Sequence, residues 1–171
     1  MSSLQVRRAA ARDLDDLRRL CLDASRNGPA VAHRGPVDPG DWITLHVPVI
    51  VVSEGTTTVG FAAALSRNIP CAAPRCAELV VYVNPDHRRR GAARRAMSEL
   101  MTVTRTMGLW KLLAYAAPED AAAQALLSRF EFREVGVFVK HLQLEGGWRD
   151  VAVHERLLMT ARRSLPSMGG A

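Results

Sequence analysis

The sequence lacks any apolar run long enough to cross a membrane. Its apolar runs, such as residues 47–52, are far shorter than the roughly 20 residues that a membrane-spanning helix needs. The first residues also lack the basic stretch followed by an apolar stretch that marks a secretory signal peptide. These absences predict a cytoplasmic protein with no membrane partner.

Patterns that bind metals or nucleotides are also missing. The three cysteines (Cys21, Cys71 and Cys76) have no ligand spacing and are expected to be free thiols. A disulfide between Cys71 and Cys76 is conceivable, but nothing in the sequence supports it. The histidines are scattered, so we expect no metal site. Neither G-x-G-x-x-G nor G-x-x-x-x-G-K-[ST] occurs, which excludes Rossmann and P-loop nucleotide sites.

The composition is that of an ordinary globular protein. The chain has 171 residues, of which 48% are apolar and 23% charged. We see no internal repeat or linker, and therefore expect one domain over residues 1–163, followed by a disordered tail at residues 164–171.

The hydrophobic pattern alternates between strand and helix periods. One face of residues 91–107 is apolar at helical spacing, through Ala93, Ala96, Met97, Leu100, Met101 and Thr104. Other helices are expected at residues 13–25, 41–46 and 118–129, the last with Pro118 near its first turn. Strands are expected at residues 4–8, 47–54, 58–67, 78–83, 109–116, 132–144 and 148–159. This order predicts an α/β (α+β) fold with helices on both faces of a sheet.

The positive charge is concentrated at one point. The formal net charge is +6, and the densest group of arginines (Arg88, Arg89, Arg90, Arg94 and Arg95) surrounds a single glycine. A compact group of this kind indicates a small anionic ligand rather than the long basic stripe of a nucleic-acid binder. No nucleic-acid-binding motif supports that alternative, so we expect no nucleic-acid partner.

The arginines lie where an expected strand turns into an expected helix. Pro85 ends the strand, and the helix N-terminus directs free N–H groups and its positive dipole end at one place. Gly91 would let the backbone approach an anion, and small Ala92 and Ala93 would not obstruct it. The site therefore suits a pyrophosphate, with arginine side chains pairing with phosphate oxygens.

This stretch resembles the signature of GNAT acetyltransferases. Arg88-x-x-Gly91-x-Ala93 is similar to their [Q/R]-x-x-G-x-[G/A] turn, and Val83-Asn84-Pro85 to the V-x-P that precedes it. Four further segments, within residues 6–153, resemble the phosphinothricin acetyltransferase branch of the family. They are Val6-Arg7-Arg8-Ala9, Pro36-x-x-Pro39-x-Asp41-Trp42, Glu78-x-x-Val81-Tyr82-Val83 and Gly146-x-Trp148-x-Asp150-Val151.

The resemblance implies a mixed, twisted sheet that is splayed near its middle, with acetyl-CoA in the opening and no metal. The N–H and C=O groups of Val81 and Val83 would hold the pantetheine arm, and Tyr82 is a cofactor-side candidate between them, although a residue at this position more often packs in the core. The N–H groups of residues 88–94 would hold the pyrophosphate, and Asp120 a further part of the coenzyme. An amine would attack the thioester directly, with no covalent enzyme intermediate. Glu78 matches the glutamate to which the family assigns the catalytic role, and a carboxylate buried among apolar neighbours is a better base. The alternative is that Glu78 forms a structural ion pair.

Several positions depart from the family pattern. Asp120 stands for the asparagine that contacts the cofactor, Leu127 for the tyrosine often used as general acid, and Glu131 for the glycine that usually precedes Phe132. On the substrate side, Glu145 stands for a histidine and Ala32 for an aromatic residue, while Arg34, Trp42 and Trp148 are the other candidates.

These departures leave the acceptor open. We expect a small amino-acid-like molecule with a primary amine. The alternatives are a protein N-terminus or lysine as acceptor, or a non-catalytic acyl-CoA-binding module. The resemblance also makes a homodimer reasonable.

Overall fold

A computed structural model describes residues 3–27, 38–44, 47–65, 75–144 and 146–158. Arg34, Glu145 and Cys71, which the sequence analysis singled out, lie outside these residues. No helix in the described ranges has the length and apolar character needed to cross a bilayer.

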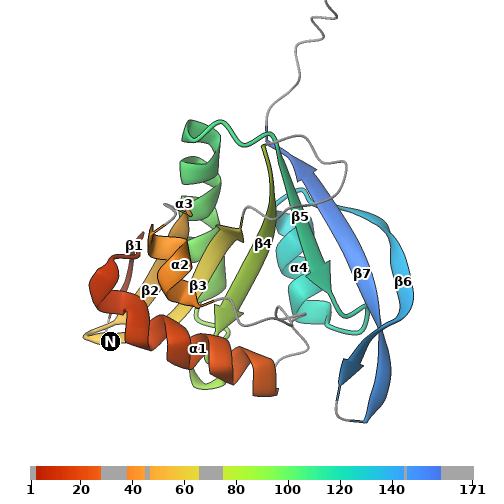
Figure 1. The fold of residues 1–171 in the computed structure, drawn as a ribbon, viewed down its shortest axis with the longest axis horizontal. Helices are drawn as coiled ribbons and strands as arrows, with labels where there is room; N and C mark the ends of the chain where they lie inside the picture. Colours follow the sequence, from red (N-terminus) through yellow and green to blue (C-terminus); the bar gives the residue numbers. More distant parts are fainter. Residues whose placement is uncertain (1–2, 28–37, 45–46, 66–74, 145, 159–171) are drawn as a thin grey trace, which may run out of the picture.

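One sheet of seven strands forms the centre of the molecule (Figure 1), and it confirms the predicted mixed α/β fold. The strands are β1 (Leu4–Arg8), β2 (Val49–Glu54), β3 (Thr57–Leu65), β4 (Cys76–Val83), β5 (Lys111–Ala116), β6 (Arg133–Leu144) and β7 (Gly147–Leu157), in the spatial order β1-β2-β3-β4-β5-β7-β6. All neighbouring strands are antiparallel except β4 and β5, which are parallel.

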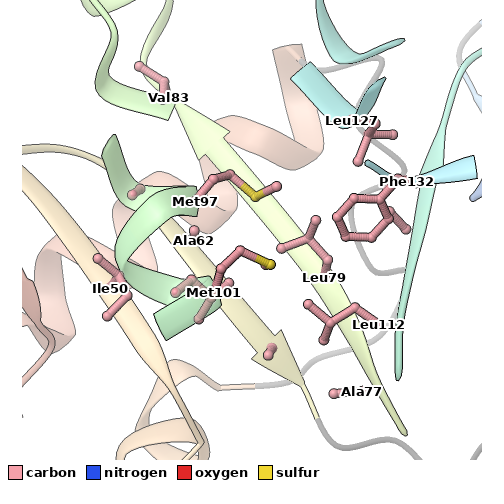
Figure 2. Close-up of a cluster of buried hydrophobic side chains, with 14 of the residues drawn as sticks. Ile50, Ala62, Ala77, Leu79, Val83, Met97, Met101, Leu112, Leu127 and Phe132 are labelled. Carbon is pink, nitrogen blue, oxygen red and sulfur yellow. The ribbon is translucent and has the colours of Figure 1, made fainter. Parts of the chain in front are cut away.

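Helices cover both faces of the sheet, as predicted. They are α1 (Leu14–Asn27), α2 (Pro39–Thr44), α3 (Ala92–Thr106) and α4 (Ala121–Arg129). On the face that carries α3 and α4, Met97 and Met101 point from α3 towards Leu79 of β4, and Leu127 and Phe132 approach Leu79 from the side of β5 (Figure 2). A second core lies on the face that carries α1 and α2, where Leu17 and Leu20 of α1 are fully buried.

The predicted apolar face of α3 is confirmed. Ala96, Met97, Leu100, Met101 and Thr104 are buried, and Ala93 is partly buried against the same core. The helix ends at Thr106 with Met107 as its C-cap, and Gly108 follows with a φ of 73°, the left-handed conformation that closes many helices.

The start of α4 differs from the prediction. Pro118 lies before the helix, which begins at Ala121 and is capped by Asp120. The Asp120 carboxylate accepts hydrogen bonds from the N–H groups of Ala122 and Ala123, at 3.1 and 3.0 Å. An aspartate at this position satisfies N–H groups that the helix itself cannot pair, so it fixes the first residue of the helix.

Glu131 adopts the conformation of the glycine that it replaces. Its φ is 57°, which is uncommon for a residue with a side chain. Its carboxylate accepts a hydrogen bond of 2.7 Å from Arg156, and this contact holds the side chain in place.

A tight contact holds β3 and β4 together at the end of β4. Gly60 pairs with Val83, and a Cβ on Gly60 would lie 2.7 Å from the carbonyl oxygen of Tyr82. Only glycine fits there without displacing backbone. β4 pairs with β3 from Glu78 to Val83, so an opening of the sheet at this end of β4 lies on its other side.

Candidate functional site

The sheet opens between β4 and β5. The two strands pair from Cys76 and Lys111 only as far as Leu79 and Ala114. Beyond that level β4 continues to Val83 and β5 to Ala116, and the strands diverge towards their C-terminal ends (Figure 1). The splayed sheet implied by the family resemblance is therefore present.

Backbone groups of β4 line this gap. The N–H of Asn84 donates to Val59 on β3 at 2.9 Å, and the direction of the backbone alternates along an antiparallel ladder. The N–H and C=O groups of Val81 and Val83 consequently point away from β3, towards the gap. The carbonyl oxygen of Val83 accepts a 3.0 Å hydrogen bond from Nε of Arg88.

A tight turn follows β4 and leads into α3. After a short 3₁₀ segment (Pro85–His87), Arg89 and Gly91 both have positive φ values, 61° and 81°. The first hydrogen bond of α3 runs from the N–H of Arg95 to Gly91 at 3.0 Å. The N–H groups of residues 92–94 have no acceptor inside the helix, and no acidic residue lies in the first turn of α3.

This turn has the chemistry of an anion site. Alternating left-handed residues turn successive N–H groups to one side, and the helix dipole adds positive potential there. Within the described residues, no atom beyond the neighbouring residues lies within 4 Å of the position that a Gly91 Cβ would occupy, so the described structure leaves the space above the turn open. Gly91 thus supplies both the required φ and room for a ligand.

The arginines of this group are all exposed, but the structure divides them into side chains that bind other residues of the protein and side chains that do not. Nε of Arg88 binds Val83, and its guanidinium lies 5.9 Å from the ring centre of Tyr82. Arg90 binds Glu54, and Arg95 binds the carbonyl oxygen of Leu4. Arg89 and Arg94 are exposed, and no hydrogen bond or ion pair holds their side chains within the described residues. They are the two cations best placed to meet an incoming anion.

Glu78 lies on β4 before the gap begins. Its backbone is level with Leu65 of β3 and Leu113 of β5, and the residue is only 8% exposed. Side chains alternate along a strand, so Glu78 faces the same side of the sheet as Tyr82, the side that carries α1 and α2. The carboxylate therefore lies on the opposite face of the sheet from α3.

Two aromatic candidates turn out to be core residues. Trp42 was a candidate for either a structural or a substrate-lining role, and it is buried, with its ring centre 5.8 Å from that of Phe61. Tyr82 lies on β4 between Val81 and Val83, but its backbone groups face β3. Its hydroxyl is buried with no hydrogen-bond partner among the described residues. Burial raises the pKa of the Tyr82 hydroxyl. Packing inside the second core accounts for both placements.

The remaining candidates are dispersed. Trp148 is 58% exposed on β7, where it lies opposite Gln143. Asp120 caps α4 with its carboxylate, as described above. Leu127 is buried beside Phe132 in the first core, so no side chain able to donate a proton stands at that position (Figure 2).

Sequence reasoning missed a buried ionic group on the face of Glu78. Glu155 on β7 is 7% exposed, binds Lys111 at 2.5 Å and also contacts Arg133. Leu113 of β5 lies between Glu155 and Glu78 in the row of paired residues. The Lys111 ammonium lowers the pKa of the Glu155 carboxyl. Lys111 and Glu155 are 44 residues apart, so no local pattern could reveal the contact.

Metal ligands do not gather in the described residues, where no three His, Cys, Asp or Glu side chains lie close enough to hold an ion. Cys76 is a buried free thiol, and burial raises the pKa of the partly buried Cys21 thiol to about 12. Cys21 is therefore not a reactive thiolate at neutral pH.

Comparison with known proteins agrees with this geometry. The sequence model of the acetyltransferase (GNAT) family matches residues 14–132. No curated protein sequence matches the chain.

Solved structures share the fold along almost the whole chain. An N-acetyltransferase from Staphylococcus aureus Mu50 is 26% identical, with a TM-score of 0.82, over 92% of this chain and 100% of that one. A ribosomal-protein-alanine N-acetyltransferase from Brucella melitensis is 26% identical, with a TM-score of 0.80, over 90% of this chain and 99% of that one. A GNAT superfamily phosphinothricin acetyltransferase from Sinorhizobium meliloti, in complex with AcCoA, is 22% identical, with a TM-score of 0.82, over 99% of this chain and 95% of that one. At that identity the last similarity shows the fold alone, so the branch stays a prediction.

Proposed function

Since the chain belongs to the GNAT family of acetyltransferases, we propose that it transfers the acetyl group of acetyl-CoA to the primary amine of a small amino-acid-like molecule. The observation that carries this proposal is the continuity of the gap and the turn. The backbone of Val81 and Val83 faces the opening between β4 and β5, and the same strand leads directly into the positive-φ turn at Gly91. An extended ligand with a phosphate end fits this arrangement.

In the proposed complex, the pantetheine arm of acetyl-CoA lies in the gap as an added strand. Its amide groups would bond to backbone groups of Val81 and Val83. Its pyrophosphate would bond to N–H groups of residues 89–94, because the N–H of Arg88 already donates to Pro85. Arg89 and Arg94 would add charge pairs, because their side chains are exposed beside the turn. The backbone of Arg90 takes part in the turn, while its side chain is already bound to Glu54.

The acceptor would approach from the face that carries α1 and α2. Glu78 faces that side, so its carboxylate can take one proton from the ammonium group, directly or through water. The neutral amine nitrogen then bonds to the thioester carbonyl carbon, while a strand N–H in the gap stabilises the developing oxyanion. The carbon–sulfur bond breaks as this intermediate collapses.

Both protons lost by the amine are accounted for in this scheme. The first is held by Glu78 and then released to solvent. The second leaves the nitrogen on collapse and reaches the thiolate sulfur through water, since Leu127 has no proton to give. The products are the N-acetylated amine and CoA in its thiol form.

A panel of amines tests the proposed acceptor class. We would incubate the protein with acetyl-CoA and follow thiol release with amino acids, amino-acid analogues, peptides with free N-termini and lysine peptides. Release with small amino-acid-like amines supports the proposal. Release only with peptides would favour the alternative of a protein acceptor. Calorimetric binding of acetyl-CoA without release under any amine would indicate a non-catalytic binding module.

We also propose that the protein forms a homodimer through β6. This strand is at the edge of the sheet, and Val135, Val137, Phe138 and Val139 are between 42% and 72% exposed. An apolar edge of this kind is suited to contact another chain. Light scattering after size-exclusion chromatography tests this: a monomeric mass at micromolar concentration would contradict it.

A further inference from the structure

Glu54 contacts the phosphate-binding turn from a distant part of the chain. It is the last residue of β2, and its side chain is 20% exposed. Its Oε2 lies 2.9 Å from Nδ1 of His87 and 3.2 Å from Nη1 of Arg90. Arg90 also reaches Oε1, at 3.4 Å. One carboxylate therefore binds both ends of the segment that contains Arg88 and Arg89.

A carboxylate is an unfavourable neighbour for a phosphate. It repels the anion, and it also occupies a guanidinium that could otherwise bind the ligand. Glu54 therefore does not raise the affinity of the site through charge. Any benefit to the site must come from the conformation that it maintains.

The conformation of the turn is unfavourable unless other contacts stabilise it. Arg89 has a φ of 61°, and a left-handed conformation is unfavourable for a residue with a side chain. Strained residues of this kind persist when contacts on both sides determine their geometry. On the N-terminal side of Arg89, Glu54 binds His87 and the carbonyl oxygen of Val83 binds Arg88. On its C-terminal side, Glu54 binds Arg90.

We infer that Glu54 is a positioning residue for the coenzyme turn: by binding His87 and Arg90 it holds residues 88–91 in the conformation that directs the N–H groups of residues 89–91 at the pyrophosphate. This rests on the proposed function, because it assumes that CoA binds at this turn. The inference fixes the direction in which CoA affinity should change. Removal of Glu54 makes the anion site more positive, yet CoA binding becomes weaker.

The test compares two variants that lose one carboxylate near the same turn. Glu54→Ala removes the contacts with His87 and Arg90. Asp86→Ala is the matched control, since Asp86 is exposed and its carboxylate has no hydrogen bond or ion pair within the described residues. Both proteins and the wild type are titrated calorimetrically with CoA and with pantetheine, which lacks the phosphates.

We expect Glu54→Ala to raise the Kd for CoA about 5-fold or more, the factor that corresponds to the loss of about one kcal/mol. Its Kd for pantetheine should be unchanged, and Asp86→Ala should bind CoA as tightly as the wild type or slightly more tightly. An unchanged or tighter Kd for CoA in Glu54→Ala overturns the inference. So does an equal loss for both ligands, which a general loosening of the fold would produce.

Two further measurements separate this inference from its assumptions. If the wild type itself does not bind CoA, the proposed function fails. His87→Ala removes one of the two contacts from a partly exposed side chain, and remains available should Glu54→Ala not fold. We expect it to show a smaller loss with the same selectivity for CoA over pantetheine. A wild-type Kd for CoA in folded His87→Ala also overturns the inference.

Discussion

Replacing Gly91 by valine tests where the coenzyme phosphates bind. Gly91 has a φ of 81°, and no other atom of the described part of the chain lies within 4 Å of its Cβ position. The stability cost therefore comes from backbone strain alone, about 1–2 kcal/mol or somewhat more for a β-branched residue. Gly108 at the other end of α3 has a φ of 73°, and the nearest atom to its Cβ position is 4.0 Å away. Gly108→Val is therefore a control with matched strain.

We expect both variants to fold and to lose a similar amount of stability, seen as a fall in Tm of about 2–8 °C. Only Gly91→Val should lose affinity for CoA, since its side chain fills the space where the pyrophosphate approaches the N–H groups. Loss of two charge-assisted hydrogen bonds, at roughly 1.5 kcal/mol each, corresponds to about 100-fold in Kd.

Calorimetric titration with CoA at one temperature, on proteins whose folding is checked by circular dichroism, measures this difference. A Gly91→Val protein that binds CoA within a few-fold of the wild type would refute the assignment of the turn. Equal losses in Gly91→Val and Gly108→Val would attribute the effect to strain instead of to ligand contact.

Three other variants test the proposed base, the arginines beside the turn and the ion pair between Arg7 and Asp13. Glu78→Gln should lower kcat about 10²–10⁴-fold and leave CoA affinity unchanged, as for removal of a general base, and full activity would make Glu78 structural. The double change Arg89→Ala with Arg94→Ala should weaken CoA far more than pantetheine and reduce the salt dependence of CoA binding; equal losses for both ligands would contradict a phosphate contact. The hydrogen bond from Arg7 lowers the pKa of the Asp13 carboxyl in the folded protein. The ionised carboxyl therefore stabilises the folded state fully above the unfolded pKa of about 3.9, and this stabilisation is lost as the pH falls through the lower folded pKa. Urea unfolding of Asp13→Asn should therefore show a smaller loss of the free energy of unfolding between about pH 5 and 2 than the wild type, and identical losses would count against this pair.

The regular elements could be predicted because their patterns are local. The spacing of Met97, Leu100 and Met101 defines one face of α3 before any packing is known, and the alternation of apolar and turn residues locates the strands. Helix starts were less certain. Pro118 and Asp120 are both acceptable near a helix N-terminus, and the capping hydrogen bonds of Asp120 decide between them.

The backbone geometry of the candidate site was predictable from the sequence, and the contacts of its side chains much less so. Gly91 and the basic residues around it mark the turn in the sequence, but they do not tell which arginines are bound elsewhere. Arg90 is held by Glu54, 36 residues away, and Arg95 by Leu4, 91 residues away. Trp42 could equally have lined a pocket, and only its packing against Phe61 identifies it as a core residue.

The short parallel ladder between β4 and β5 also bears on how the protein unfolds. Strands β1 to β4 form one antiparallel group and β5 to β7 another, and four residue pairs join the two groups. Parts of a protein that share few hydrogen bonds can open independently, so we expect amide hydrogens near this junction to exchange with solvent before those within either group. A coenzyme seated in the gap would bond to one group while it contacts the other. Its binding should then slow exchange across the junction and make thermal unfolding more cooperative, and the apparent Tm would depend on how much acetyl-CoA is present.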